Sequence, residues 1–219
     1  MEHTTPIPYS GDINECTPAE ELGKKINIGA GKRPILGFLN FDIVSGDNIL
    51  YAEADNIPSC SDKSVELIFS NAVFEHLYPN EYLNIFSEWK RILKDDGAIV
   101  CLGIPDFKSI SRLYVDNILS EEEVYRYALG EIEEHKDIDL FKGQIHKRLF
   151  NIDILRNIFE ENKFKCLVFN YSYPNEEHKI NLGVIACMTQ LNDPLKILVK
   201  IPSVSDYINI QTIKEFKCL

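Results

Sequence analysis

The sequence has no pair of cysteines at the spacing of a metal site or a redox motif. Its six cysteines are scattered, and no histidine stands near them at ligand spacing. They are Cys16, Cys60, Cys101, Cys166, Cys187 and Cys218. Zinc sites and small disulfide-rich domains need clustered cysteines, so we expect buried, reduced thiols and no metal.

Long apolar runs are also missing. No run approaches the roughly 20 residues that cross a bilayer, and residues 1–8 have neither a basic start nor an apolar core. A secretory leader would show both features. We therefore expect a cytoplasmic protein without a membrane span.

Basic residues are scarce. Lys and Arg number 23 against 34 Asp and Glu, which gives a net charge of −11. Such a field repels phosphate backbones, and no cluster of Lys and Arg reverses it locally. Nucleic acid is therefore not an expected partner.

A third glycine is absent from the one glycine-rich turn. The run from Lys25 to Gly31 reads as a buried strand that ends in Gly29-Ala30-Gly31, but Pro34 stands where a dinucleotide-binding motif needs glycine. Asp42 follows Gly29 by only thirteen positions, too few for a crossover helix with its turns. These absences disfavour a nicotinamide cofactor, whose pyrophosphate needs that helix. S-adenosylmethionine has a ribose and no phosphate, and it fits better.

What the sequence does have is a series of apolar runs of strand length. They lie at 26–29, 38–42, 48–52, 65–70, 98–104, 164–171 and 182–188. Continuous apolar runs are typical of strands covered on both faces, as in parallel sheets. The last two runs follow each other without a long helix, which predicts an antiparallel pair at the sheet edge. We expect an α/β fold.

Helical periodicity appears between these runs. An apolar stripe predicts a helix over about 79–93, which ends where Gly97 can take a left-handed turn. Thr17 and Ser120 have the surroundings of helix N-caps, the latter for a helix reaching about Glu134, and Asn151 precedes another helical pattern. We expect one domain over 1–219, with a helical lid insertion at 106–150 and a C-terminal extension at 192–219.

Polar and glycine residues stand where the predicted strands end. Gly29, Asp42, Glu53 and Asn71 all fall at such carboxyl ends. Ligands of open α/β sheets bind at this edge, and a carboxylate there can accept hydrogen bonds from ribose hydroxyls. Glycine lets a ligand lie against the backbone. The pattern predicts a pocket for a nucleoside cofactor.

These residues resemble the class I S-adenosylmethionine-dependent methyltransferases, which have a Rossmann-like fold. The likeness is strongest to small predicted bacterial methyltransferases associated with cell-surface polysaccharide genes. It covers about 25–165 and rests on an ordered set of motifs. They are Asn-Ile-Gly-Ala-Gly, Gly-Phe-Leu-Asn-Phe-Asp, Asn-Ala-Val-Phe-Glu-His-Leu, the stretch from Glu88 to Gly97, Ile-Pro-Asp-Phe and Lys-Gly-Gln-Ile-His-Lys.

The resemblance implies roles for individual residues. Gly29 and Gly31 would border the methionine moiety, Asp42 would hold the ribose, and Glu53 with Ala54 would flank the adenine. We add as cofactor-binding candidates Asn27 and Ala30 in the glycine turn, and Asn71 at the strand end where the methyl group would be presented.

Three residues are candidates for a catalytic base. His146 follows the predicted helix of the lid, and it serves either in substrate binding and proton removal or in a structural hydrogen bond. His76 starts the turn into a helix and serves either as a base or as a cap of that helix. Asp106 suits the N-terminus of the next helix as well as catalysis.

We expect methylation of an oxygen on a small molecule or on a precursor of a surface polysaccharide. Ser70-Asn71-Ala72-Val73 differs from the Asn-Pro-Pro-aromatic motif of base-amine methyltransferases, which disfavours a nucleobase. The alternative is a noncatalytic module that keeps the fold and binds a cofactor or a protein. The sequence does not set the oligomeric state.

Overall fold

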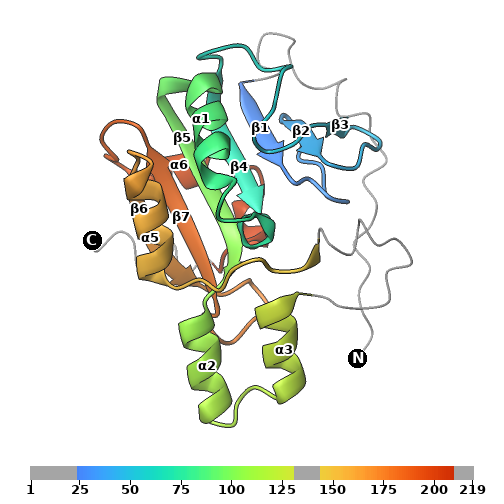
Figure 1. The fold of residues 1–219 in the computed structure, drawn as a ribbon, viewed down its shortest axis with the longest axis vertical. Coiled ribbons are helices and arrows are strands. Elements are labelled where there is room, and N and C mark those ends of the chain that lie inside the picture. Colours follow the sequence, from blue (N-terminus) through green and yellow to red (C-terminus); the bar gives the residue numbers. More distant parts are fainter. Residues whose placement is uncertain (1–23, 131–143, 210–219) are drawn as a thin grey trace.

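The computed structural model describes residues 24–130 and 144–209 and centres on a seven-stranded sheet of order β3-β2-β1-β4-β5-β7-β6 (Figure 1). The strands are β1 (Lys25–Ile28), β2 (Leu39–Asp42), β3 (Leu50–Tyr51), β4 (Val65–Asn71), β5 (Leu93–Pro105), β6 (Lys165–Tyr171) and β7 (Asn181–Cys187). Strands β1 to β5 pair in parallel, and β7 runs antiparallel to β5 and β6. The predicted α/β fold, with a mostly parallel sheet and an antiparallel edge pair, is confirmed.

Helices α1 (Tyr82–Ile92) and α5 (Ile152–Glu161) cover one face of the sheet (Figure 1). Their apolar stripes meet in a cluster of rings with centroids about 5 to 6 Å apart, made of Phe74, Tyr82, Phe86, Trp89, Phe159 and Phe164. Offset and edge-on ring pairs each contribute roughly 0.5–1.5 kcal/mol beyond area burial. The helix predicted over 79–93 is confirmed with slightly shorter ends, and Asn151 caps α5 by accepting from Ile154 N.

The end of α1 differs from the prediction. Gly97 is not left-handed, because the chain passes from Ile92 directly into β5. The β4–β5 ladder shifts its register between Val65 and Leu67, so the residues before Ala98 bulge from it. Glycine is needed at 97 for space, since a Cβ there would lie 2.8 Å from two carbons of Leu93.

The other face of the sheet is covered mostly without long helices. Ile35 and Phe38 pack on it from the β1–β2 connection. The C-terminal segment adds α6 (Pro194–Leu198) and the short 3-10 helix η3 (Val204–Asp206), and it buries Leu198, Ile201 and Ile208 against the same strands. This segment therefore serves as the second core layer.

Two helices lie beyond the carboxyl ends of the strands, away from α1 and α5 (Figure 1). They are α2 (Phe107–Val115) and α3 (Glu121–Leu129), and both fall inside the predicted insertion. Ser120 forms the predicted capping box with Glu123. Helix α3 ends at Leu129, earlier than predicted, because its C-cap Gly130 leaves the helical conformation with φ +89°. Glycine is needed there, since a Cβ would collide with the Gln144 carbonyl oxygen.

Some predictions fall outside the described residues, namely the helix from Thr17 and the cysteines Cys16 and Cys218. The four described cysteines, Cys60, Cys101, Cys166 and Cys187, are free thiols. Among the described helices, none combines the length and the apolarity that a bilayer crossing demands.

Candidate functional site

The glycine turn and Asp42 meet at the carboxyl ends of β1 and β2. Gly29 (φ +71°) and Gly31 (φ +54°) are both left-handed. The Asp42 carboxylate accepts Gly31 N at 2.8 Å through one oxygen and Val44 N at 3.1 Å through the other. The turn is therefore held by the acid that the sequence predicts for the ribose.

Asn40 braces the β1–β2 connection, in which the structure forms no helix. Its Oδ1 accepts from Asn27 Nδ2 and Ile35 N, and its Nδ2 donates to the carbonyls of Ile35 and Phe38. Asn27, predicted to bind cofactor, uses its buried side chain in this network. Sequence reasoning missed Asn40, although a polar residue inside an apolar strand signals a satisfied internal network.

The loop that carries Glu53 and Ala54 is fixed to α1. Trp89 Nε1 donates to Ala54 O at 2.9 Å, and Glu88 Oε1 accepts from Ile57 N at 2.8 Å. Arg91 binds Glu88 and also reaches carbonyls of the loop. The exposed Glu53 carboxylate accepts from the Tyr51 hydroxyl.

A tyrosine network stands at the ends of β4 and β5. Tyr173 donates its hydroxyl to Asn71 Oδ1 at 3.1 Å, and Tyr171 accepts from Gly103 N at 2.7 Å. Burial raises the pKa of Tyr173 to about 12, so its hydroxyl stays protonated. Sequence reasoning missed both tyrosines, since nothing in the sequence around residues 171–173 marks them as partners of Asn71 and Gly103.

The β1–β2 end fits an adenosyl cofactor. A Cβ built on Gly31 meets no atom within 4 Å, so open space adjoins that backbone. Each Asp42 oxygen accepts one amide and keeps a further lone pair, which a ribose hydroxyl can use. Gly29, Gly31 and Asp42 would therefore hold the sugar and the amino-acid end of S-adenosylmethionine.

Two of the predicted catalytic residues come together after β4. His76 belongs to the 3-10 helix η2 (Phe74–His76), and its ring centroid lies 4.9 Å from that of His146. Glu75, only 2% exposed, joins them, and its Oε1 lies 3.9 Å from His76 Nε2. The His146 amide donates to Leu129 O, which places the ring against the end of α3.

Burial sets the charge state of this cluster. It raises the pKa of Glu75 to about 8. Burial, followed by the neighbouring His146, lowers the pKa of His76 to about 4. Burial also lowers the pKa of His146. Both imidazoles are therefore uncharged at neutral pH, and Glu75 keeps its proton.

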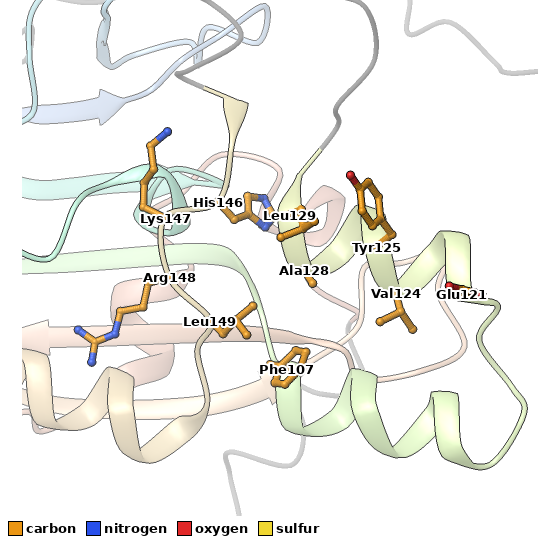
Figure 2. Close-up of a pocket in the computed structure, with 10 residues that line it drawn as sticks. All are labelled: Phe107, Glu121, Val124, Tyr125, Ala128, Leu129, His146, Lys147, Arg148 and Leu149. Carbon is orange, nitrogen blue, oxygen red and sulfur yellow. The ribbon is translucent and has the colours of Figure 1, made fainter.

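A cavity of about 470 Å³ opens beside His146, between α3 and residues 146–149 (Figure 2). Its walls are mostly apolar, and they are formed by Phe107, Glu121, Val124, Tyr125, Ala128, Leu129, His146, Lys147, Arg148 and Leu149. Figure 2 shows the Lys147 and Arg148 side chains directed away from α3. The volume and the lining are typical of small-molecule pockets.

The hydrogen bonds that the described residues form with Asp106 involve none of the residues of the histidine cluster. It caps α2, accepting from Lys108 N and Ser109 Oγ, and a third bond comes from Asn170 Nδ2 of β6. Its proposed catalytic part remains a prediction, and its observed bonds join β5, α2 and β6.

Packing contacts connect the glycine turn with the cavity. A Cβ on Gly29 would collide with Val73 Cγ2, so Val73 lies directly against the turn. Val73 is the N-cap of η2, whose last residue, His76, packs on His146 at the cavity wall. The predicted cofactor residues and the cavity therefore border the same short helix.

Residues 40–101 match the model of a family described as a methyltransferase domain. The match runs from β2 into β5 and includes Asp42, Glu53 and Asn71. No curated protein matches this chain.

Solved structures resemble the fold. The PH0226 protein from Pyrococcus horikoshii is 12% identical with a TM-score of 0.50, over 77% of this chain and 83% of that one. A SAM-dependent methyltransferase from Archaeoglobus fulgidus is 16% identical with a TM-score of 0.49, over 74% and 84% of the two chains. A possible histamine N-methyltransferase from Thermotoga maritima is 17% identical with a TM-score of 0.49, over 81% and 86%. At 12% identity, the likeness to the PH0226 protein is evidence of a shared fold and no more.

Proposed function

We propose that this S-adenosylmethionine-dependent methyltransferase transfers a methyl group to an oxygen of an acceptor bound in the cavity beside His146. The methyltransferase domain matched over 40–101 and the order of the sheet support the enzyme class and its cofactor. The observation that carries the proposal is the packing of Gly29 on Val73 and of His76 on His146, which joins the glycine turn to the cavity through η2.

The cofactor side is assigned to the β1–β2 end. When bound, S-adenosylmethionine supplies an electrophilic methyl group on a sulfonium. The Asp42 carboxylate would accept hydrogen bonds from the ribose hydroxyls of the cofactor. The backbone at Gly31, which has no side chain, would face the amino-acid end of the cofactor. The loop with Glu53 and Ala54 would border the adenine, held in place by Trp89.

On the acceptor side, alignment supplies much of the catalysis, because methyl transfer is an in-line displacement. His146 Nδ1 lies 3.0 Å from Tyr127 O of α3, so the ring has a fixed direction relative to the cavity. Its part would be to accept a hydrogen bond or a proton from the acceptor hydroxyl. Asn71, fixed by Tyr173, would line the strand end between the two ligands.

The cavity favours a small acceptor with an apolar body. Val124, Ala128 and Leu149 offer no hydrogen-bonding side chain, and the basic groups of the wall point away from α3. A surface-polysaccharide precursor is the second acceptor class that we propose, and it comes from the resemblance of the motifs. The net charge of −11 supports the exclusion of nucleic acid as a substrate.

Calorimetry with S-adenosylhomocysteine tests the cofactor site. We expect Asp42→Ala to weaken binding by about 1–3 kcal/mol, or roughly 5- to 150-fold, because hydrogen bonds to a charged group are lost. Asp47→Ala removes the same charge from an exposed position in the following loop and should leave affinity unchanged.

Equal affinities in wild type and Asp42→Ala would remove Asp42 from the site. Methyl transfer is then measured with labelled cofactor on alcohols, phenols and sugar precursors. Tight cofactor binding without transfer to any of them would favour the noncatalytic module.

A further inference from the structure

We propose that Glu75, His76 and His146 form a binding site for a divalent transition-metal ion. Each residue offers one ligand atom, and these three atoms all lie within 4.8 Å of one another. Two ligands come from η2, directly after β4, and the third from the segment that follows α3 by way of residues outside the description. The fold, and not a sequence motif, assembles this set.

The two imidazoles are oriented as metal ligands are. His76 Nδ1 lies 3.3 Å from Ile145 O, and His146 Nδ1 lies 3.0 Å from Tyr127 O. A carbonyl oxygen only accepts, so each Nδ1 carries the hydrogen and each Nε2 keeps a lone pair. Metal-bound histidines almost always donate their second ring N–H to such an oxygen.

Glu75 is buried in this cluster without hydrogen bonds, among the described residues, that would account for its position. It is 2% exposed, and its Oε2 has no hydrogen-bond partner in the described part of the chain. Its Oε1 is 3.9 Å from His76 Nε2, too far for a hydrogen bond. A buried carboxyl group that lacks hydrogen-bond partners is costly. A cation bound among the three side chains would replace the proton of Glu75 and give its oxygens a partner.

The donor set selects the kind of ion. Two imidazoles and one carboxylate suit zinc, iron(II) or cobalt(II) better than magnesium or calcium, which prefer oxygen ligands. At bond lengths of about 2.1 Å, tetrahedral ligand atoms stand about 3.4 Å apart, so the three side chains would draw closer on binding. Three protein ligands leave a coordination position open.

The open position gives the ion a place in the reaction. His146 lines the cavity, so an ion on this residue would stand at the cavity wall. Bound there, the acceptor oxygen would lose its proton more readily, as metal-bound water does. This last step rests on the acceptor and the cavity of the proposed function. Because the Nε2 lone pair of His146 would then bind the ion, the hydroxyl proton would pass to water and not to His146. Metal binding itself does not rest on the proposed function.

Cobalt(II) titration of the metal-free full chain tests the site through visible absorption, with zinc(II) as competitor. We expect one ion per chain, displaced by zinc. Glu75→Gln, which keeps the side-chain shape, and His146→Ala should each weaken binding about tenfold or more. His178→Ala is the control, because His178 lies in the loop after β6, outside the cluster.

Absence of a stoichiometric cobalt signal in the wild type would overturn the proposal. Equal affinity in all three variants would do so too, since the ion would then sit elsewhere. Circular dichroism selects folded variants, and His146→Ala carries the test if Glu75→Gln does not fold. The titration uses neither cofactor nor acceptor, so it stays distinct from a failure of methyl transfer.

Discussion

The two ends of the sheet's carboxyl edge are built differently. At the β1–β2 end, hydrogen bonds join residues close in sequence, such as Gly31 to Asp42, 11 positions apart, and Asn27 to Asn40, 13 apart. At the β4–β5 end, Asn71 is 102 positions from Tyr173, and Gly103 is 68 from Tyr171. The first end is a local structure, and the second exists only once the sheet has formed.

The difference matters for stability and for function. Closing a short loop costs less chain entropy than closing a long one, so the β1–β2 end can be specified by a few neighbouring residues. The β4–β5 end gathers groups that no local sequence brings together, including the Glu75, His76 and His146 cluster. Substitutions at the β1–β2 end should therefore disturb contacts within one short segment, whereas substitutions at the β4–β5 end should disturb contacts between segments far apart in sequence.

The largest expected loss of stability comes from a substitution in the glycine turn at the β1–β2 end. Gly29→Ala should lower the unfolding free energy by about 2–5 kcal/mol, because a left-handed backbone disfavours alanine and the new methyl collides with Val73. Gly31→Ala has the same backbone handicap in open space and should cost about 1–2 kcal/mol. Urea unfolding followed by circular dichroism measures both.

The Val73 collision can be separated from the backbone cost. Adding Val73→Ala to Gly29→Ala should recover stability relative to the sum of the single changes, because the two sites share one contact. Equal costs for Gly29→Ala and Gly31→Ala would contradict the close packing of the turn on η2.

A smaller effect tests the distant end. Tyr173→Phe should lower the unfolding free energy by about 1–2 kcal/mol, since Asn71 Oδ1 loses its hydroxyl donor in a partly buried place. Tyr114→Phe, on an exposed ring of α2, should change it by less than about 0.5 kcal/mol. The same urea experiment applies, and identical losses in both variants would mean that the Tyr173 hydroxyl contributes nothing specific.

The smallest expected effect concerns Glu88, which accepts a hydrogen bond from Ile57 N, 31 positions away. This separation in sequence lies between those of the hydrogen bonds at the β1–β2 end and at the β4–β5 end. The hydrogen bond from Arg91 holds the pKa of Glu88 below its ordinary value of 4.5. Its stabilisation is therefore present above pH 4.5 and disappears as the pH falls through the lowered pKa. Glu88→Gln should cost about 0.5–1 kcal/mol at pH 7, discounted because Arg91 is a third exposed.

The test of Glu88 is a pH series of unfolding free energies. The gap between wild type and Glu88→Gln should narrow from pH 7 toward pH 3. The matched control is Glu161→Gln at the end of α5, because the Glu161 side chain is exposed and forms no hydrogen bond or ion pair within the described residues. A gap that stays constant over this range would contradict the charge-assisted bond.

Prediction from sequence succeeded where the signal was periodic or local. All seven strands were located, because buried apolar runs have few other places in an α/β fold, and Ser120 and Asn151 were correct as caps. Gly97 was predicted wrongly, since a glycine after a helix suggests a left-handed turn, yet space beside Leu93 was the real constraint. The roles of the predicted site residues stay predictions.

By itself, the sequence determined the strands, the glycine turn and the place of Asp42, because these depend on burial patterns and on neighbours a few positions away. Only the tertiary structure decided that Glu75 and His76 meet His146, that Tyr173 meets Asn71, and that the C-terminal segment becomes a core layer. Such contacts form when separate elements pack on one sheet, and no periodicity in the chain records which of them will touch.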